Sequence, residues 1–335
     1  MPKNLLTPEQ RAKLMADLST SESPAVRQKS LTILLMDEGK SLKEIDLVTL
    51  RKEEIKRTNL DIYGGMLTDG DSNRWLLDRL AQPEPLMVSR FGNIESKCVA
   101  DYLASAYGDE TLKNMAGSPG FFPVQPHTLD RFSQLFLEAA EAIDMLGVWF
   151  NPGEAEIIRR SCPQAVLAPL ASLEPYYHDR PWSQALAGKR VLVVHPFTQT
   201  IERQYQQHRQ QLFENPQILP PFTLLTLPAV QSFAGCQTPF ASWFDALDFM
   251  SEQVSQLEFD IALIGCGAYG LPLAARIKQL GKQAIHLGGA LQLLFGIRGQ
   301  RWDGDPFFQA LYNSHWVRPT SQETPNTHRR YPAYW

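Results

Sequence analysis

Short apolar runs alternate with longer amphipathic stretches from Leu86 onward. The runs are LMVSR, GVWF, AVLAPL, KRVLVVHPF, FTLLTLPAV, FDIALIG and KQAIHLGG. Unbroken apolar runs of this length are typical of parallel strands that are buried on both faces, and the stretches between them have helical spacing. The pattern therefore predicts an α/β fold: a Rossmann-like, mostly parallel sheet with helices on both faces.

The first part of the chain carries helical signals instead. Thr7-Pro8-Glu9-Gln10 places a capping residue before proline at the first helical position, and Ser41-Leu42-Lys43-Glu44 repeats the capping-box pattern. We expect an N-terminal helical extension over residues 1–60 and a Rossmann-like domain over residues 61–300. An aromatic and proline-rich tail, residues 301–335, should pack back on the domain, over a hydrophobic seam rather than over a ligand cleft.

A glycine turn follows the apolar run Ile261–Ile264. Gly265, Gly267 and Gly270 have the spacing G-x-G-x-x-G, and a helical stretch then runs to Leu280, before Gly281. Glycines let backbone N–H groups approach a phosphate closely, and the start of the following helix favours an anion. The turn predicts phosphate binding, although such turns also serve packing alone.

The position of the usual ribose ligand departs from the dinucleotide pattern. A dinucleotide-binding unit places Asp or Glu at the end of the next strand, about 20 residues on. This chain has His286 there, followed by a second glycine turn at Gly288 and Gly289. An NAD(P)-dependent oxidoreductase therefore stays an alternative, although this chain lacks the acidic ribose ligand that such an enzyme normally has.

Four strand ends are expected to form one cleft, because ligands of parallel sheets lie beyond the carboxyl ends of the strands. They are residues 89–92, 195–197, 265–270 and 286–289. The candidate ligand-contacting residues in them and directly after them are Gly92, Asn93, Gly265, Gly267, Tyr269, Gly270, His286, Gly288 and Gly289.

Asn93 and Glu95 stand two residues apart where the first strand ends. Two oxygen-bearing side chains in this arrangement can reach one hard cation or a sugar hydroxyl. Equally, Asn93 can cap the following helix, with Glu95 favoured by its dipole. Both interpretations stay open on the residues alone.

Composition narrows the function classes. The 335 residues carry a net charge of -4 and are 44% hydrophobic, which allows a large core and disfavours nucleic acid as the main partner. No apolar stretch is long enough to span a membrane, and four widely spaced cysteines (Cys98, Cys162, Cys236 and Cys266) suit reduced thiols. We expect a cytoplasmic protein; peripheral membrane association and a homo-oligomer are both compatible with the sequence.

Two segments together resemble a known family. SRFGNIE followed by a helix, with LIGCGAYGLPLAARIKQLGKQAIHLGG near the other end, resembles the bacterial GT-D glycosyltransferases over roughly Leu86–Gly299. The run from LIGCGAYG through HLGGALQLLFGI to NSHWVRP and the final YW is similar to uncharacterised proteins of bacterial surface-polysaccharide clusters.

The resemblance implies a GT-D-like fold and a nucleotide-sugar donor, with an Asp-x-Glu pair that holds Mn²⁺ or Mg²⁺ on the diphosphate. Glu95 matches the second carboxylate, and Asn93 stands where the first would be. An amide can supply one oxygen but not the charge, so metal-dependent transfer, metal-free transfer and lost catalysis all stay open.

The resulting hypothesis is a glycosyltransferase of surface-polysaccharide or glycoconjugate synthesis, acting on a glycan or lipid-linked acceptor. A non-catalytic sugar-nucleotide-binding subunit is a second alternative. Arg90 and His195 are the candidates for stabilising the leaving diphosphate, and Glu95, Glu202 and Asp303 for accepting the proton of the acceptor. Cys266 is a weaker candidate, as a nucleophile without a recognisable activating partner.

Overall fold

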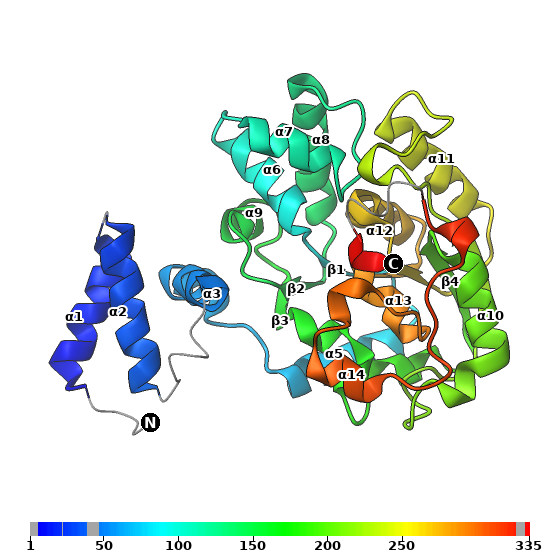
Figure 1. The fold of residues 1–335 in the computed structure, drawn as a ribbon, viewed down its shortest axis with the longest axis horizontal. Coiled ribbons are helices and arrows are strands. Elements are labelled where there is room, and N and C mark those ends of the chain that lie inside the picture. Colours follow the sequence, from blue (N-terminus) through cyan, green and yellow to red (C-terminus); the bar gives the residue numbers. More distant parts are fainter. Residues whose placement is uncertain (1–5, 22, 39–46, 326–331) are drawn as a thin grey trace.

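The computed structural model describes residues 6–21, 23–38, 47–325 and 332–335. Among them, seven strands form one sheet in the order β3-β2-β1-β7-β6-β4-β5, and every pair of neighbours is parallel. The strands are β1 Leu86–Arg90, β2 Met145–Val148, β3 Val166–Pro169, β4 Arg190–His195, β5 Thr223–Pro228, β6 Ile261–Ile264 and β7 Gln283–His286 (Figure 1). The predicted α/β fold with a parallel sheet is confirmed.

Burial explains why the strands read as unbroken apolar runs. All residues of β2, β6 and β7 are buried, whereas the edge strands β3 and β5 keep partly exposed residues. A strand in the middle of a parallel sheet has helices on both faces, so neither set of its side chains meets water.

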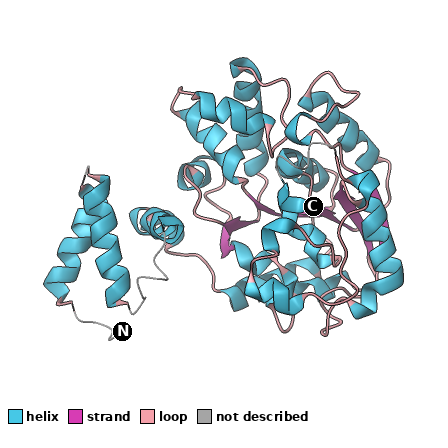
Figure 2. Cartoon of the chain, viewed as in Figure 1, coloured by secondary structure: helices cyan, strands magenta, loops and turns pink. Residues whose placement is uncertain are grey.

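Helices cover both faces of the sheet, as Figure 2 shows. On one face α6 Asn93–Leu103, α7 Asp109–Ala116, α8 Pro126–Ala140, α9 Glu154–Ser161, α11 Trp243–Ser255 and α12 Gly270–Gln279 enclose one core. On the other, α5 Asp69–Leu80, α10 Thr198–His208, α13 Leu291–Leu294 and α14 Pro306–Leu311 enclose a second. Alternate residues of β4 enter the two cores, with Leu192 and Val194 in the first and Val191 and Val193 in the second.

The N-terminal residues are helical as expected. The helices α1 Pro8–Thr20, α2 Pro24–Asp37 and α3 Leu47–Thr58 share a small leucine core and lie to one side of the sheet in Figure 1, before the short α4 Leu60–Tyr63. The capping box of Thr7 and Gln10 is present, while the one predicted at Ser41 lies outside the described residues. The division into three regions stays a prediction.

The tail lies against the sheet domain. Val317 pairs with Ile297 in an isolated bridge, and the backbone N–H of Gln300 donates to the carbonyl of Trp335. The side chain of Gln292 donates to the carbonyl of Tyr334 at 3.1 Å. Among the described helices, none has the length and apolar character needed to cross a membrane.

Candidate functional site

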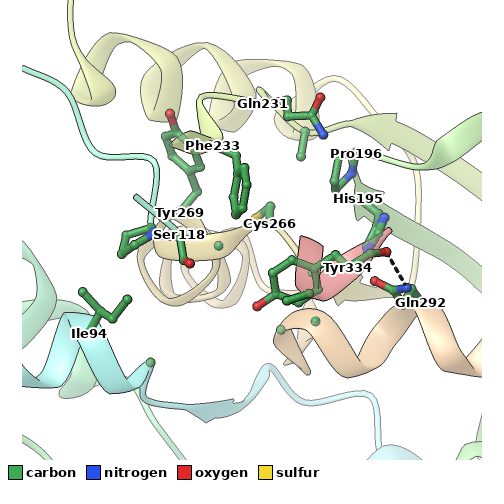
Figure 3. A pocket seen from close by; sticks show the side chains of 18 of the residues that line it. Ile94, Ser118, His195, Pro196, Gln231, Phe233, Cys266, Tyr269, Gln292 and Tyr334 are labelled. Carbon is green, nitrogen blue, oxygen red and sulfur yellow. Dashed lines mark hydrogen bonds between the residues drawn. The ribbon is translucent and has the colours of Figure 1, made fainter. Parts of the chain in front are cut away.

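A cavity of about 350 Å³ opens at the carboxyl edge of the sheet (Figure 3). Its walls come from the segments that follow β1, β2, β4, β5, β6 and β7, from Ser118 and Pro119, and from the tail. The chain leaves β4 toward β5 and leaves β6 in the opposite direction toward β7, although β4 and β6 are neighbours. Such a reversal opens a crevice between two strand ends, which is where parallel α/β sheets bind ligands.

Most of the predicted ligand-contacting residues line this one cavity. They are Arg90, Gly92, Asn93, Glu95, His195, Gly265, Gly267, Tyr269, Gly288 and Gly289. Gly270 and His286 are not among the lining residues. All four predicted strand ends therefore meet, but two of the residues named in them lie behind the wall.

Several lining residues were not predicted from the sequence. Trp149, Gln292, Arg301, Tyr334 and Trp335 all line the cavity. Trp149 directly follows β2, so the rule that pointed to the other strand ends would have found it. The tail residues carried no comparable signal, and the expectation that the tail covers only a hydrophobic seam is wrong because Tyr334 and Trp335 form part of the cavity wall.

One side of the cavity, which we call the arginine side, consists of Arg90, Trp149 and Arg301. The guanidinium carbons of Arg90 and Arg301 lie 4.9 and 6.0 Å from the centroid of the Trp149 ring, respectively. The Nε atom of Arg90 is buried without a hydrogen-bond partner. Neither arginine forms a salt bridge with another described residue. The arginine side thus holds two guanidinium groups without a salt bridge, although the buried carboxyls of Glu95, Glu154 and Glu174 lie near enough to interact with the charge of Arg90.

A buried carboxyl holds the loop that carries Trp149. Glu154, fully buried at the start of α9, accepts backbone N–H groups of Trp149 and Asn151 at 3.1–3.3 Å. Burial raises the pKa of Glu154 to about 7, although these hydrogen bonds and the charge of Arg90 act in the opposite direction. The position of Trp149 therefore depends on a carboxyl that titrates near neutrality.

Glu95 is the only carboxyl side chain among the lining residues. It stands in the first turn of α6 and folds back over Gly92, where a methyl group would come within 1.9 Å of its carboxyl oxygen. Burial raises the pKa of Glu95, while the charge of Arg90 and the backbone N–H of Glu95 itself act against that rise. A carboxyl with a raised pKa can take up a proton from a substrate hydroxyl.

The donors at this end of β1 do not fit the Mn²⁺ or Mg²⁺ that the resemblance implies. Asn93 is exposed, and the Glu95 carboxyl is turned toward the start of its own helix. In the part of the chain that the structure describes, no three His, Cys, Asp or Glu side chains gather closely enough to hold a metal ion. A divalent cation on a diphosphate is usually held by one or two carboxylates together with phosphate oxygens, and the single carboxyl of this cavity is turned toward its own helix.

A second group of residues, which we call the histidine side, consists of His195 and Gly265 in the cavity wall and His286 and Gly270 behind it. The two histidines are 2% and 4% exposed, and each occupies the space that a glycine leaves. A methyl group on Gly265 would come within 2.8 Å of the His195 ring and 2.7 Å of the Gly288 carbonyl oxygen, and one on Gly270 within 2.2 Å of Nε2 of His286. The first and last glycines of the G-x-G-x-x-G turn therefore admit the protein's own histidines.

The hydrogen bonds of His195 define its neutral form. Its Nδ1 accepts the backbone N–H of Phe197 at 3.0 Å, so the proton of a neutral ring must reside on Nε2. Burial lowers the pKa of His195 to about 3. His195 consequently acts as a neutral N–H donor and not as a base, which favours the predicted role in stabilising an anion.

His286 is held away from the cavity. Its Nδ1 lies 3.0 Å from the hydroxyl of Ser89, and its Nε2 abuts Gly270. Burial and, to a smaller degree, the charge of Arg90 lower the pKa of His286 to about 3. These contacts give His286 a packing role behind the wall.

The second glycine turn also serves contacts within the protein. A methyl group on Gly288, which has φ of +63°, would come within 2.7 Å of a guanidinium nitrogen of Arg90. One on Gly289 would come within 2.3 Å of the Tyr334 ring. The turn therefore makes room for a cation on one side and an aromatic ring of the tail on the other.

The remaining chemical candidates lie in less suitable places. Burial raises the pKa of the Cys266 thiol, which disfavours the thiolate that a nucleophile requires. Glu202 accepts a hydrogen bond from the Thr226 hydroxyl, and Asp303 pairs with Arg318; neither carboxyl lines the cavity. Of the three candidate bases, only Glu95 reaches the site.

No family model and no curated protein matches the chain. Two solved structures have a similar fold. One is described as the selenomethionine-substituted structure of domain of unknown function 1792, with 14% identity, a TM-score of 0.46, and coverage of 81% of this chain and 96% of that chain. The other is described as "The highly conserved domain of unknown function 1792 has a distinct glycosyltransferase fold", with 13% identity, a TM-score of 0.43, and coverage of 79% and 95%. At TM-scores below 0.5, neither likeness says what this chain binds or catalyses.

Proposed function

We propose that the chain is a glycosyltransferase that takes a nucleotide-sugar donor and transfers the sugar to a glycan or lipid-linked acceptor. The observation that carries the proposal is the combination of the unpaired Arg90 and Arg301 with aromatic walls and one carboxyl in a single cavity. Its volume of about 350 Å³ falls in the range of roughly 300–1,000 Å³ that small-molecule sites occupy.

Charge selects an anionic ligand. Arg90 and Arg301 keep their charge because guanidinium groups are not deprotonated in proteins, whereas His195 is neutral. Glu95 is the one acidic lining group that opposes them. Two oxygens of a phosphate can accept two parallel N–H groups of one guanidinium. A diphosphate can therefore bind on the arginine side of the cavity.

Aromatic rings suit the remainder of such a donor. The rings of Phe197 and Phe233 lie 5.7 and 5.0 Å from that of Trp335, measured between centroids. The ring centroids of Phe233 and Tyr334 lie 6.4 Å apart, and Figure 3 labels both residues among those that line the cavity. Flat apolar surfaces of this kind stack on a nucleobase or on the apolar face of a sugar ring.

The lining residues divide the steps of the reaction between them. The bond between the anomeric carbon and the diphosphate oxygen breaks, and the electron pair leaves with the diphosphate toward Arg90 and Arg301. The acceptor hydroxyl forms the new bond to the anomeric carbon, and Glu95 takes up its proton. The Nε2–H of His195 is placed to donate to an oxyanion, and preorganised donors of this kind lower the barrier.

The contacts of the glycine turn give little support to the alternative function of an NAD(P)-dependent oxidoreductase. The backbone N–H of Gly265 donates to the carbonyl of Val194 at 2.9 Å, and is therefore not free for a pyrophosphate. The ring of His286 fills the space beside Gly270, and His286 also has the sequence position of the acidic ribose ligand. These contacts favour a ligand held by side chains over one held by the glycine turn.

A panel of UDP-, GDP- and other nucleotide sugars tests the proposal, with release of the nucleoside diphosphate as the readout. At least one donor should turn over, by transfer or slow hydrolysis. The Glu95→Gln variant keeps an acceptor for its backbone N–H and should lower kcat by roughly 10²–10⁴-fold with little change in KM for the donor.

Glu202→Gln is the matched control, because Glu202 lies outside the cavity, and it should leave turnover unchanged. Binding without turnover would support the non-catalytic alternative. Absence of both binding and turnover, with tight binding of NADH or NADPH, would replace the proposal with the oxidoreductase.

A further inference from the structure

We infer that the cavity holds the diphosphate of its ligand without a divalent cation, and that the guanidinium groups of Arg90 and Arg301 supply the positive charge in its place. The inference rests on the proposed function for the identity of the ligand. The inference goes beyond the proposed function because it states which groups balance the negative charge of the diphosphate. It also departs from the metal-binding pair that the resemblance implies.

Arg90 differs from the arginines on the protein surface. Arg159, Arg190 and Arg276 are each 32–44% exposed, and each pairs with an aspartate at 2.7–3.0 Å. Arg90 lies partly buried at the end of β1 and forms no salt bridge with a described residue. Arg79, beside Trp75, is likewise partly buried without such a salt bridge, but Arg90 lines the cavity, where its guanidinium is available to an anionic ligand.

Trp149 brings the second cation to the first. Its ring lies within reach of both guanidinium groups, and Arg301 is also 5.1 Å from the Trp302 ring. Stacking on aromatic rings orients a guanidinium while leaving its N–H donors free. A diphosphate diester carries one negative charge on each phosphate, which the two guanidinium charges balance.

The carboxyl of Glu95, which would hold a metal, already contacts the start of its own helix. Glu95 folds back over Gly92 toward its own backbone N–H, and Asn93 contributes no charge. To bind a divalent cation, Glu95 would have to turn its carboxyl away from the start of the helix. Two guanidinium groups need no such rearrangement.

Calorimetric titration of the whole chain in EDTA tests the inference with inorganic pyrophosphate, UDP and GDP as probes. At least one probe should bind in EDTA, and added Mn²⁺ should leave the affinity unchanged once complexation of the probe is taken into account. Arg301→Met keeps the aliphatic stem on the tryptophans and should lower the affinity by about 10- to 100-fold, the value of a charge-assisted hydrogen bond. The affinity of Arg301→Lys should fall between those of the wild type and Arg301→Met.

The matched control is Arg131→Met, an exposed arginine that also lies over an aromatic ring, 3.8 Å from the centroid of Phe244, but outside the cavity. It should bind like the wild type, and the thermal midpoint of each variant confirms that it is folded. EDTA-resistant binding without sugar transfer leaves the inference intact and removes the proposed function. Binding that disappears in EDTA and returns with Mn²⁺ overturns the inference and leaves the proposed function in place. If no probe binds under any condition, both are wrong.

Discussion

The polar side chains of the arginine side and of the histidine side differ in whether they have partners within the protein. On the arginine side Arg90 and Arg301 have no partner among the described carboxylates, so their donors are left for a ligand. On the histidine side His195 accepts a backbone N–H and His286 lies against Ser89, so each has a partner within the protein. Both sides stand at strand ends, yet we infer that one recognises a ligand and that the other mainly holds the turns in place.

The two sides also respond in opposite directions to pH. Burial lowers the pKa of the histidines on one side and raises that of Glu154 beneath the other. In each case the low dielectric favours the neutral form. Four predictions follow from this contrast.

The largest effect is expected from the histidines. Their native pKa of about 3 lies below the ordinary value of 6.5, so the stability that their neutral forms contribute is complete above pH 6.5 and is lost as the pH falls. At pH 5 the two histidines together should cost roughly 4 kcal/mol relative to pH 8, from about 1.36 kcal/mol per pH unit for each. Urea unfolding at pH 8, 6.5 and 5 measures this loss as the difference between the wild type and a variant without the two histidines, because Glu154 changes the wild-type stability in the opposite direction.

The double variant His195→Asn, His286→Asn should lose most of this pH dependence, because Asn can accept the Phe197 N–H without titrating. The exposed His127→Asn is the control and should unfold with the same pH dependence as the wild type. An unchanged slope in the double variant would show that these histidines ionise normally in the native state.

Glu154 should give the next largest effect, with the opposite sign. Its native pKa of about 7 lies above the ordinary 4.5, so the stability that its neutral form contributes is complete below pH 4.5 and is lost as the pH rises through 7. Between pH 5 and pH 8 the wild type should lose up to roughly 3 kcal/mol relative to Glu154→Gln. The difference between the two unfolding curves isolates this group from the histidines.

The exposed Glu252→Gln should track the wild type across the same range. If Glu154→Gln also tracks it, the carboxyl is already ionised in the folded protein at pH 5, and the loop that carries Trp149 does not respond to pH as inferred.

Gly270→Ala should destabilise the fold through the histidine side. The added methyl group would lie 2.2 Å from Nε2 of His286, a buried ring that cannot swing away. Overpacking of this kind costs about 1–3 kcal/mol. Gly70→Ala, in α5 with open space around it, is the control and should be neutral or stabilising. Equal stability of the two variants in urea would contradict the packing role of Gly270.

The smallest effect is expected from Trp149→Leu. Loss of the ring removes the surface that orients both guanidinium groups, worth about 1 kcal/mol, or roughly fivefold in affinity. Titration with pyrophosphate or UDP in EDTA measures it. Trp75→Leu removes a tryptophan that likewise lies beside an arginine, Arg79, but outside the cavity, and should not change the affinity. An equal loss in both variants would point to a general effect on the fold.

The position of the cleft could be predicted because it depends on local patterns and one topological rule. Apolar runs locate the strands, and the carboxyl ends of parallel strands share one edge. Arg90, His195 and Gly265 were therefore placed together from the sequence, and they do line one cavity. The partner of each could not be predicted, because His195 meets Gly265 only when β4 and β6 are neighbours in the sheet.

Arg301 and Glu154 show the other limit. Arg301 follows the last strand in a segment without apolar periodicity, and only the packing of the tail brings it within 6.0 Å of the Trp149 ring. Glu154 reads as an ordinary acidic residue in the first turn of a helix, and only its burial gives it a raised pKa. Neither property is encoded within a window of a few residues.

The sequence by itself determined the class of fold and the edge of the sheet where a ligand would lie, because hydrophobic periodicity and glycine turns are local and short-ranged. Only the tertiary structure decided which polar groups are paired within the protein and which are left for a ligand. Pairing and burial depend on neighbours that are distant in the chain, and burial sets whether a histidine or carboxyl keeps its charge. For that reason the glycine turn, which indicated phosphate binding, proved to admit two histidines, and the guanidinium groups of Arg90 and Arg301, which form no salt bridge with a described residue, lie beside Trp149.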